Sequence, residues 1–241
     1  MKFIRKEDFV YFSYIDSQKI FAGCTTKIGY KEAYSDNRLN INTNRNSIMN
    51  ALYPDYVVHY LLQNHSDTIY FTHDADYAQG VEGDGLITLQ AGEIVCVTVA
   101  DCGSVVFFDK NCSLAAVVHC GWRGLQAGII PKMISRLKLY ASPSELTAII
   151  GPHIHQNSYE VGSEFYSMFN HKSLLLKNGN LYFSQNHVIT EQLVSNGITT
   201  IFDCNMNTFS LSSLFFSHRN NAEIGRMFVF AGIKKGLRIK P

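Results

Sequence analysis

The chain is 241 residues long, yet it has almost no net charge. Its 21 Lys and Arg residues are balanced by 20 Asp and Glu residues, which leaves a formal net charge of +1. Proteins that bind nucleic acid or an anionic membrane concentrate positive charge on one surface, whereas here the basic residues are scattered along the sequence. The charge distribution therefore argues against nucleic-acid and membrane partners.

Long apolar runs are missing as well. No run approaches the roughly 18 apolar residues that cross a membrane, and the opening stretch MKFIRKEDFVYFSYID carries charges where a signal peptide has an uninterrupted apolar core. We therefore expect a cytoplasmic protein. In that reducing compartment most of its 6 cysteines are free thiols or metal ligands. Because no CxxC spacing occurs, a structural zinc ribbon is not expected.

Internal repeats, blocks of one charge and linkers rich in Pro, Gly or Ser are also missing. The chain has only 5 Pro, and its 46% hydrophobic content is enough for a sizeable core. We therefore predict a single domain spanning residues 1–241. Strand and helix patterns intermingle along the chain, with several hairpin-like pairs, and this arrangement predicts the α+β class.

The spacing of apolar residues predicts the individual elements. Strands are expected within 1–23 and at 68–72, 86–89, 93–99, 104–109, 113–119, 147–150 and 227–233. Helices are expected at 46–63, 124–140 and 186–196. Pro54 breaks or restarts the first helix, and Pro131 either kinks the second or marks its first regular turn. Asn186 is the expected N-cap of the third helix, which ends at Gly197.

A thiol and an imidazole stand at the ends of two neighbouring predicted strands. If Lys110 and Asn111 form a two-residue hairpin loop, Cys102 lies directly opposite His119; a loop one residue longer shifts the pairing by about one position. Opposed residues have Cβ atoms about 4.5–5.5 Å apart, close to what two ligands of one metal ion require. A lone Cys/His pair more often has a packing role than a chemical one. The residues around Cys102 and His119 are therefore needed to distinguish the two roles.

The surroundings favour chemistry. His73 ends another predicted strand, and with Cys102 and His119 it makes three ligands, the number that catalytic zinc sites use while leaving the fourth position to water or substrate. Arg123 follows Trp122 and precedes Gly124 where a helix begins, a position suited to an anion. We therefore predict a catalytic metal site with an anion site beside it.

Four motifs carry a family resemblance. They are TVADCGSVVFFD, AAVVHCGWRGLQAG, GPHIHQNSYEVG and FFSHRNNAEIGRM, and in order and spacing they resemble the YfiH-like laccase-domain family. Weaker matches at FAGCTTKIGY, LNIN and THDAD extend the likeness over roughly residues 20–233. The combination of ADC, a step of seventeen residues from its Cys to His119, and GWRG is highly specific.

The resemblance implies a purine nucleoside phosphorylase that acts on adenosine, inosine, guanosine and methylthioadenosine and also has adenosine deaminase activity. It implies one metal, usually zinc, and small-molecule partners, namely a purine nucleoside and phosphate. The implied metal ligands are His73, Cys102 and His119. We predict Cys102, His119 and Arg123 as the catalytic residues, and Asn40, Arg123, Tyr159 and Arg226 as the residues that bind the substrate.

Other functions stay open at this point. Older naming calls the family a multicopper polyphenol oxidase. A laccase-like multicopper site needs about ten His and several HxH pairs, whereas the chain has 9 His in all. It has one HxH pair, His153 and His155, which we interpret as part of a loop. Copper could still occupy the three-ligand site. Cys102 and His119 could instead form a cysteine-hydrolase pair, a peptidoglycan-editing role has been linked to the family, and a non-enzymatic metal-binding regulator is the last alternative. The preferred nucleoside and the choice between monomer and homodimer are not readable from the sequence.

Overall fold

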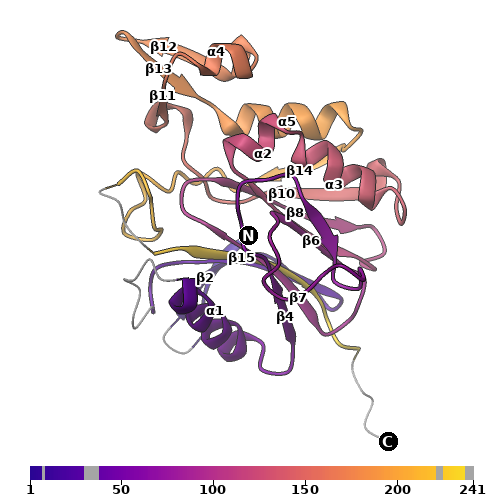
Figure 1. The fold of residues 1–241 in the computed structure, drawn as a ribbon. Coiled ribbons are helices and arrows are strands. Elements are labelled where there is room, and N and C mark those ends of the chain that lie inside the picture. Colours follow the sequence, from indigo (N-terminus) through magenta and orange to yellow (C-terminus); the bar gives the residue numbers. More distant parts are fainter. Residues whose placement is uncertain (7–8, 30–37, 221–224, 237–241) are drawn as a thin grey trace, which may run out of the picture.

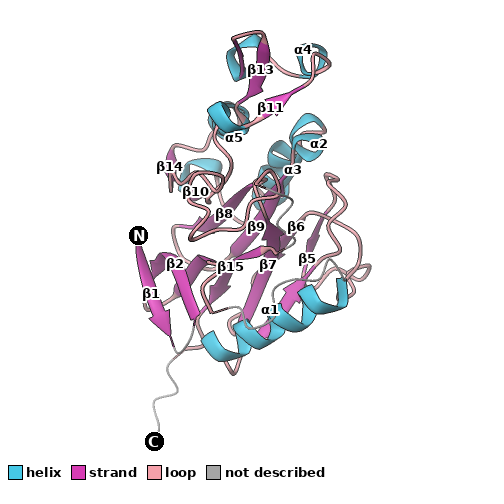
Figure 2. Cartoon of the chain, turned by 90° about the vertical axis from the view of Figure 1, so that its left-hand side faces the viewer, coloured by secondary structure: helices cyan, strands magenta, loops and turns pink. Residues whose placement is uncertain are grey.

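Two six-stranded sheets stack face to face in a computed structural model that describes residues 1–6, 9–29, 38–220 and 225–236, with only the backbone described for 38–44 (Figure 1). Figure 2 shows α1 covering one sheet, α2, α3 and α5 covering the other, and a small three-stranded sheet beyond α5. The α+β class predicted from the sequence is confirmed.

In each large sheet, some neighbouring strands are far apart in the sequence. The first sheet runs in the order β1 (Lys2–Lys6), β2 (Phe9–Asp16), β3 (Ile20–Thr25), β15 (Met227–Ile233), β7 (Glu93–Val99) and β4 (Val57–Tyr60). The second runs in the order β14 (Thr200–Asp203), β10 (Leu146–Ile150), β8 (Gly103–Asp109), β9 (Ala115–Cys120), β6 (Gly85–Thr88) and β5 (Ile69–Phe71). The small sheet consists of β11 (Glu160–Val161), β13 (Asn180–Phe183) and β12 (Leu174–Lys177).

The helices are short apart from α1. They are α1 (Arg38–Leu52), α2 (Trp122–Gln126), α3 (Ile129–Leu137), α4 (Phe165–Met168) and α5 (Gln185–Ser195). Three 3₁₀ turns lie at Pro143–Glu145, Gln156–Ser158 and His171–Ser173. Within the described part of the chain, no helix has the length and apolar content that crossing a membrane requires.

The core consists of three apolar layers. One lies between the two sheets, a second between the second sheet and α2, α3 and α5, and a third between the first sheet and α1. The central strands β8 and β9 are therefore buried on both faces, since every residue of each strand is buried. This double burial explains why residues 103–120 read as nearly continuous apolar runs rather than as an alternating pattern.

Two predicted helices differ from the structure. The helix predicted at 46–63 ends at Leu52, and residues 57–60 form β4, which pairs in parallel with β7. Sequence-local periodicity cannot reveal that long-range pairing. The helix predicted at 124–140 is two helices, because Gly128 has φ 81° between α2 and α3. Pro131 lies in the first turn of α3, one of its two predicted positions.

The third predicted helix is confirmed with a different cap. Ser184, not Asn186, precedes α5, and its hydroxyl accepts a hydrogen bond from the backbone N–H of His187 at 3.1 Å. The helix ends before Gly197, whose φ of 90° suits a left-handed C-terminal position.

The β8–β9 hairpin has a longer loop than predicted. Phe108 pairs with Ala115, so residues 109–114 make the connection. The Asp109 carboxylate accepts hydrogen bonds from the backbone N–H groups of Asn111, Ser113 and Leu114. The register is consequently shifted by two residues, and His119 pairs with Ser104 rather than with Cys102.

Candidate active site

Three metal-binding side chains converge at one end of the second sheet. The ligand atoms of His65, Cys102 and His119 all lie within 4.8 Å of one another. Cys102 Sγ is 4.0 Å from His65 Nε2, and the two imidazole centroids are 4.9 Å apart. His119 is 3% exposed, whereas His65 is exposed, so the cluster is buried on one side and opens to solvent on the other.

The hairpin explains why Cys102 and His119 meet despite the shifted register. Ser104 is the direct partner of His119, and Cys102 lies two residues before Ser104. Side chains two residues apart in extended chain point to the same face, so Cys102 approaches His119 as a diagonal neighbour. Cys102 stands in the turn between β7 and β8, while His119 lies near the end of β9.

His65 takes the place that was predicted for His73. His73 is exposed, and its ring packs 5.1 Å from that of Phe71. The assignment of His73 to the cluster is therefore corrected. The reason is strand direction: β5 runs parallel to β6, and β6 is antiparallel to β9, with Gly85 opposite Val118. His119 is thus level with the start of β5, where His65 lies, and His73 follows the far end.

One buried carboxylate holds both imidazole-bearing segments. Asp84 is 0% exposed, and its Oδ1 is 2.7 Å from Nδ1 of His119. The same side chain accepts hydrogen bonds from the backbone N–H of His65 at 3.2 Å, from the backbone N–H of Ser66 at 2.7 Å and from the Ser66 hydroxyl at 2.9 Å. A carboxylate on Nδ1 orients the ring and leaves Nε2 as its ligating nitrogen.

The protonation states of the cluster are coupled. Burial alone would raise the pKa of the Cys102 thiol, but the charge of His119 and hydrogen bonds from His119 and His65 outweigh it and lower that pKa to about 6. Burial would lower the pKa of His119, but the Cys102 thiolate and Asp84 raise it to about 9. Near neutral pH the pair therefore favours a thiolate beside an imidazolium.

We expect Cys102 in metal-free protein to remain reactive at mildly acidic pH. Because its pKa is lowered to about 6, its alkylation by iodoacetamide should be nearly constant between about pH 7 and 9 and should fall below about pH 6. Mass spectrometry of the labelled peptide measures this rate. The pKa of Cys112 is raised by burial, so its labelling should increase only in alkaline solution. A rise of Cys102 labelling near pH 9 instead would show that the thiolate is not stabilised.

Glycines around Trp122 allow the close packing of the site. A Cβ on Gly121 would lie 2.5 Å from Cδ2 of His65, and one on Gly124 would lie 2.8 Å from the carbonyl oxygen of Ser66. The loop bearing His65 can therefore pack directly on the start of α2. The glycines that the sequence places around Trp122 and Arg123 have this steric role.

The substrate-binding residues that the sequence predicts have different positions. Arg123 is exposed, with its guanidinium 4.1 Å over the Trp122 ring. Burial raises the pKa of Tyr159, the charge of Cys102 raises it further, and the charge of Arg123 lowers it. Tyr159 is therefore close enough to both Cys102 and Arg123 to be affected by their charges. Arg226 directly precedes Met227, which pairs with Val99 at the end of β7. Asn40 is in α1, and its side chain lies outside the described residues.

Arg219 was not selected from the sequence, although it lies in the quoted motif FFSHRNN. Its guanidinium is 5.1 Å over the Tyr159 ring, and its backbone N–H donates to Asp101 at 2.7 Å. Asp101 has φ 81° and also accepts hydrogen bonds from the hydroxyls of Thr208 and Ser217. The residue before Cys102 thus ties the segment bearing Arg219 to the cluster.

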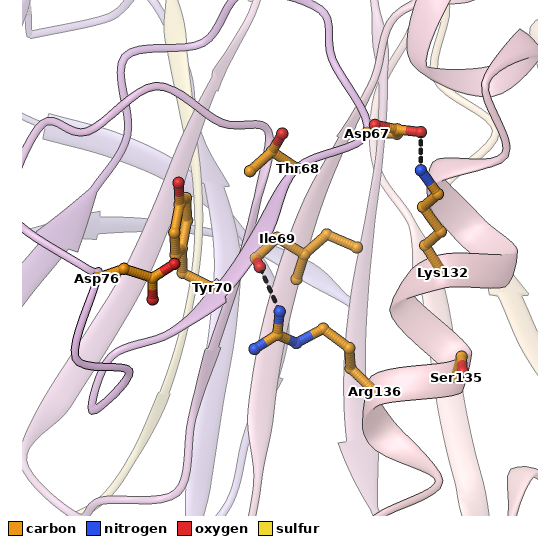
Figure 3. A pocket seen from close by; sticks show the side chains of 8 residues that line it. All are labelled: Asp67, Thr68, Ile69, Tyr70, Asp76, Lys132, Ser135 and Arg136. Atoms are coloured by element: carbon orange, nitrogen blue, oxygen red, sulfur yellow. Dashed lines mark hydrogen bonds and ion pairs between the residues drawn. The ribbon is translucent and has the colours of Figure 1, made fainter.

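A cavity of about 450 Å³ beside α3 is lined by paired charges (Figure 3). Lys132 forms an ion pair with Asp67, and Arg136 donates to the carbonyl oxygen of Ile69 at 2.8 Å. Arg136 also pairs with Asp74 at 2.5 Å. These pairs cover the outer edge of β5, so we assign this cavity a structural role.

Comparison with known families identifies the chain. A family model described as "Multi-copper polyphenol oxidoreductase laccase" matches residues 17–234. The chain belongs to this family. A purine nucleoside phosphorylase of Clostridium acetobutylicum is 35% identical over 187 residues, which cover 74% of this chain and 77% of that protein.

Solved structures share the fold of this chain. A Bacillus licheniformis protein named YfiH has a TM-score of 0.78 at 27% identity, covering 92% of this chain and 99% of that one. A Neisseria meningitidis protein has a TM-score of 0.82 at 20% identity, covering 95% and 100%, which supports the fold alone. The resemblance to YfiH-like proteins is confirmed.

The donor set of this laccase-family member fits a metal ion. Two imidazole nitrogens and a thiol within 4.8 Å are ligands of the type that Zn²⁺ and Cu²⁺ accept. A set of three leaves one coordination position for a substrate or water. Across the described ranges, this is the only group of three or more His, Cys, Asp or Glu side chains with such proximity.

Proposed function

We propose that the chain is a zinc-dependent purine nucleoside phosphorylase whose metal is held by His65, Cys102 and His119. The observation that carries the proposal is the convergence of these three ligand atoms within 4.8 Å, with His119 oriented by Asp84 at 2.7 Å. The names of its relatives support the reaction class. In this reaction phosphate displaces the purine from the nucleoside and gives ribose 1-phosphate.

Each residue of the site has a role in this reaction. A bound Zn²⁺ supplies a Lewis acid and lowers the pKa of coordinated water. Arg123 and Arg219, both exposed beside the cluster, supply positive charge for phosphate. The half-buried Tyr159 ring offers a stacking surface for the purine. Asp84 holds Nδ1 of His119, so Nε2 would be the atom that ligates the metal.

The donor set supports zinc as the proposed metal. Two imidazole nitrogens and one thiolate, with room for a fourth ligand, are a donor set of the kind that catalytic zinc sites use. Cu²⁺ binds most such sites more tightly, so the metal found will also depend on availability. A polyphenol oxidase of the multicopper type needs several His- and Cys-rich clusters, whereas the described residues contain one convergent group of three or more His, Cys, Asp or Glu.

We propose that the same site also deaminates adenosine. It consumes water instead of phosphate, so the same metal position can serve both reactions while only phosphorolysis needs the arginines. The HxE and PCxxC signature of the familiar zinc deaminases is missing from the sequence. The acid and base of this reaction therefore come from a different arrangement.

A metal-free cysteine hydrolase is the second candidate, and one contact favours it. Cys102, His119 and Asp84 form a Cys–His–Asp series in which the carboxylate holds the imidazole at 2.7 Å and the thiol pKa is lowered. This candidate gives His65 no role as a ligand. It also predicts that activity survives removal of metal.

Product analysis tests the proposed reaction. Protein incubated with adenosine and phosphate should yield adenine and ribose 1-phosphate, and product formation should depend on phosphate. Inosine formed without phosphate reports the deamination. If neither product appears with any purine nucleoside and the zinc-loaded protein, the proposed function is wrong.

We expect Arg123→Ala and Arg219→Ala each to raise KM for phosphate. Loss of a charge-assisted contact to phosphate should slow phosphorolysis by roughly 10- to 1000-fold, which corresponds to about 1.5–4 kcal/mol. Deamination of adenosine should change much less because it uses no phosphate. Lys132→Ala, in the separate cavity beside α3, is the control. Equal loss of both activities would instead make the arginine concerned a residue that only holds the site together.

A further inference from the structure

A second, polar cavity of about 240 Å³ lies beside the start of α5 and the segment of His153 and His155. Its lining residues are His153, Ile154, His155, Gln156, Asn157, Ser184, Asn186 and Asn205. None of these side chains is an Asp, Glu, Lys or Arg. Gln185 donates to the carbonyl oxygens of both Asp101 and Ile154, so it connects the Cys102 turn to one residue of the cavity lining.

His153 is arranged in the cavity wall as a metal-ligating histidine is. The residue is 1% exposed, and its Nδ1 is 2.8 Å from the carbonyl oxygen of Gly151. Because a carbonyl oxygen only accepts, Nδ1 carries the proton and Nε2 presents a lone pair. Nε2 is buried, and no described residue forms a hydrogen bond with it. Histidine ligands usually donate their second ring N–H to a backbone carbonyl or carboxylate in this way.

Asn186 adds an amide oxygen that, like Nε2 of His153, has a free lone pair. Its Nδ2 donates to Oδ2 of Asp203 at 2.9 Å, and since a carboxylate only accepts, the amide orientation is fixed. Oδ1 is then left buried, with no hydrogen-bond partner among the described residues. The buried lone pairs of His153 Nε2 and Asn186 Oδ1 destabilise the fold unless a hydrogen-bond donor or a cation binds them.

His155 supplies the second imidazole. It lies two residues from His153, its ring centroid is 5.2 Å from that of His153, and it also lines the cavity. Residues two apart in extended chain share a face. Two imidazoles and an amide oxygen thus line one cavity, and none of the lining residues is Lys or Arg. Such a set is suited to a borderline transition-metal ion.

We propose that His153 and His155, with Asn186, bind a divalent transition-metal ion at a second site, separate from the His65–Cys102–His119 cluster. The HxH pair is then a ligand pair and not a plain loop. The proposal uses none of the residues assigned to nucleoside phosphorolysis, so either can fail without the other.

Titration of metal-depleted protein with Co²⁺ tests the second site. Co²⁺ bound by a thiolate has a charge-transfer band that Co²⁺ bound only by nitrogen and oxygen lacks, so spectra separate the two sites. Wild-type protein should bind about two ions per chain, and His153→Ala about one, with the thiolate band unchanged. Cys102→Ser should show the reverse, losing the thiolate band and keeping the second ion.

His155→Ala is the second variant, because His153 is buried and its replacement can impair folding. This variant should bind the second Co²⁺ at least about 10-fold more weakly than wild type. The circular dichroism spectrum of its metal-free form should stay that of wild type. His73→Ala, an exposed histidine outside both sites, is the control for general surface binding. Binding of a single Co²⁺ that shows the thiolate band in wild-type protein, or equal retention of the second ion in His155→Ala and His73→Ala, would overturn the proposal and leave water as the occupant of the cavity.

Discussion

Replacing His65 by Ala is expected to lower phosphorolysis by at least about 1000-fold, because the loss of one of three ligands removes metal-based stabilisation worth about 4 kcal/mol or more. The His65 side chain is exposed, so the fold should survive the change. Steady-state rates of ribose 1-phosphate formation, together with metal content per chain, measure the effect.

His73→Ala is the matched control for this variant. Both histidines are exposed and flank β5, but only His65 lies within 4.8 Å of the other ligands. We expect His73→Ala to stay within about a factor of two of wild type, as surface substitutions usually do. Comparable losses in the two variants would contradict the ligand set given by the structure.

Asp84→Asn is the second substitution with a large expected effect. The new amide group would face Nδ1 of His119 or the N–H groups of His65 and Ser66, all of which donate to Asp84. We expect metal affinity to fall roughly 10- to 100-fold, the range for lost partners of ligating histidines. We also expect the free energy of unfolding to fall by about 3 kcal/mol, because a buried charge pair is broken.

Competition with a chelator, performed well below the melting temperature, separates these two effects. Asp67→Asn is the control, since Asp67 is partly exposed and pairs with Lys132 outside the cluster. If folded Asp84→Asn protein holds its metal as tightly as Asp67→Asn protein does, Asp84 is a stabilising residue without a positioning role.

The sequence was most informative where both chemistry and burial are local. The continuous apolar runs predicted the strands at 93–99 and 104–109 within one residue of β7 and β8. The hairpin between β8 and β9 also follows from its two flanking runs. Cys102 and His119 could be selected because both stand at the ends of these strands, so a two-residue error in register left them at the same edge.

Long-range pairing could not be read in the same way. The position of His65 depends on β5, a strand of three residues, running parallel to β6. Nothing in the residues around His65 or His73 reports that direction. Asp84 acts through a side chain buried behind His119, and in the sequence it is only one Asp in a glycine-rich turn. The β4 strand likewise forms because β7 is beside it.

Metal removal is the most direct test of the central claim that His65, Cys102 and His119 hold a catalytic metal. Phosphorolysis of adenosine is to be measured on protein as purified, after chelation and after addition of Zn²⁺. We expect about one metal ion per chain at this cluster, loss of ribose 1-phosphate formation on chelation and its recovery with Zn²⁺. Full activity in protein shown to be free of metal would contradict the account and assign the chemistry to Cys102, His119 and Asp84 alone.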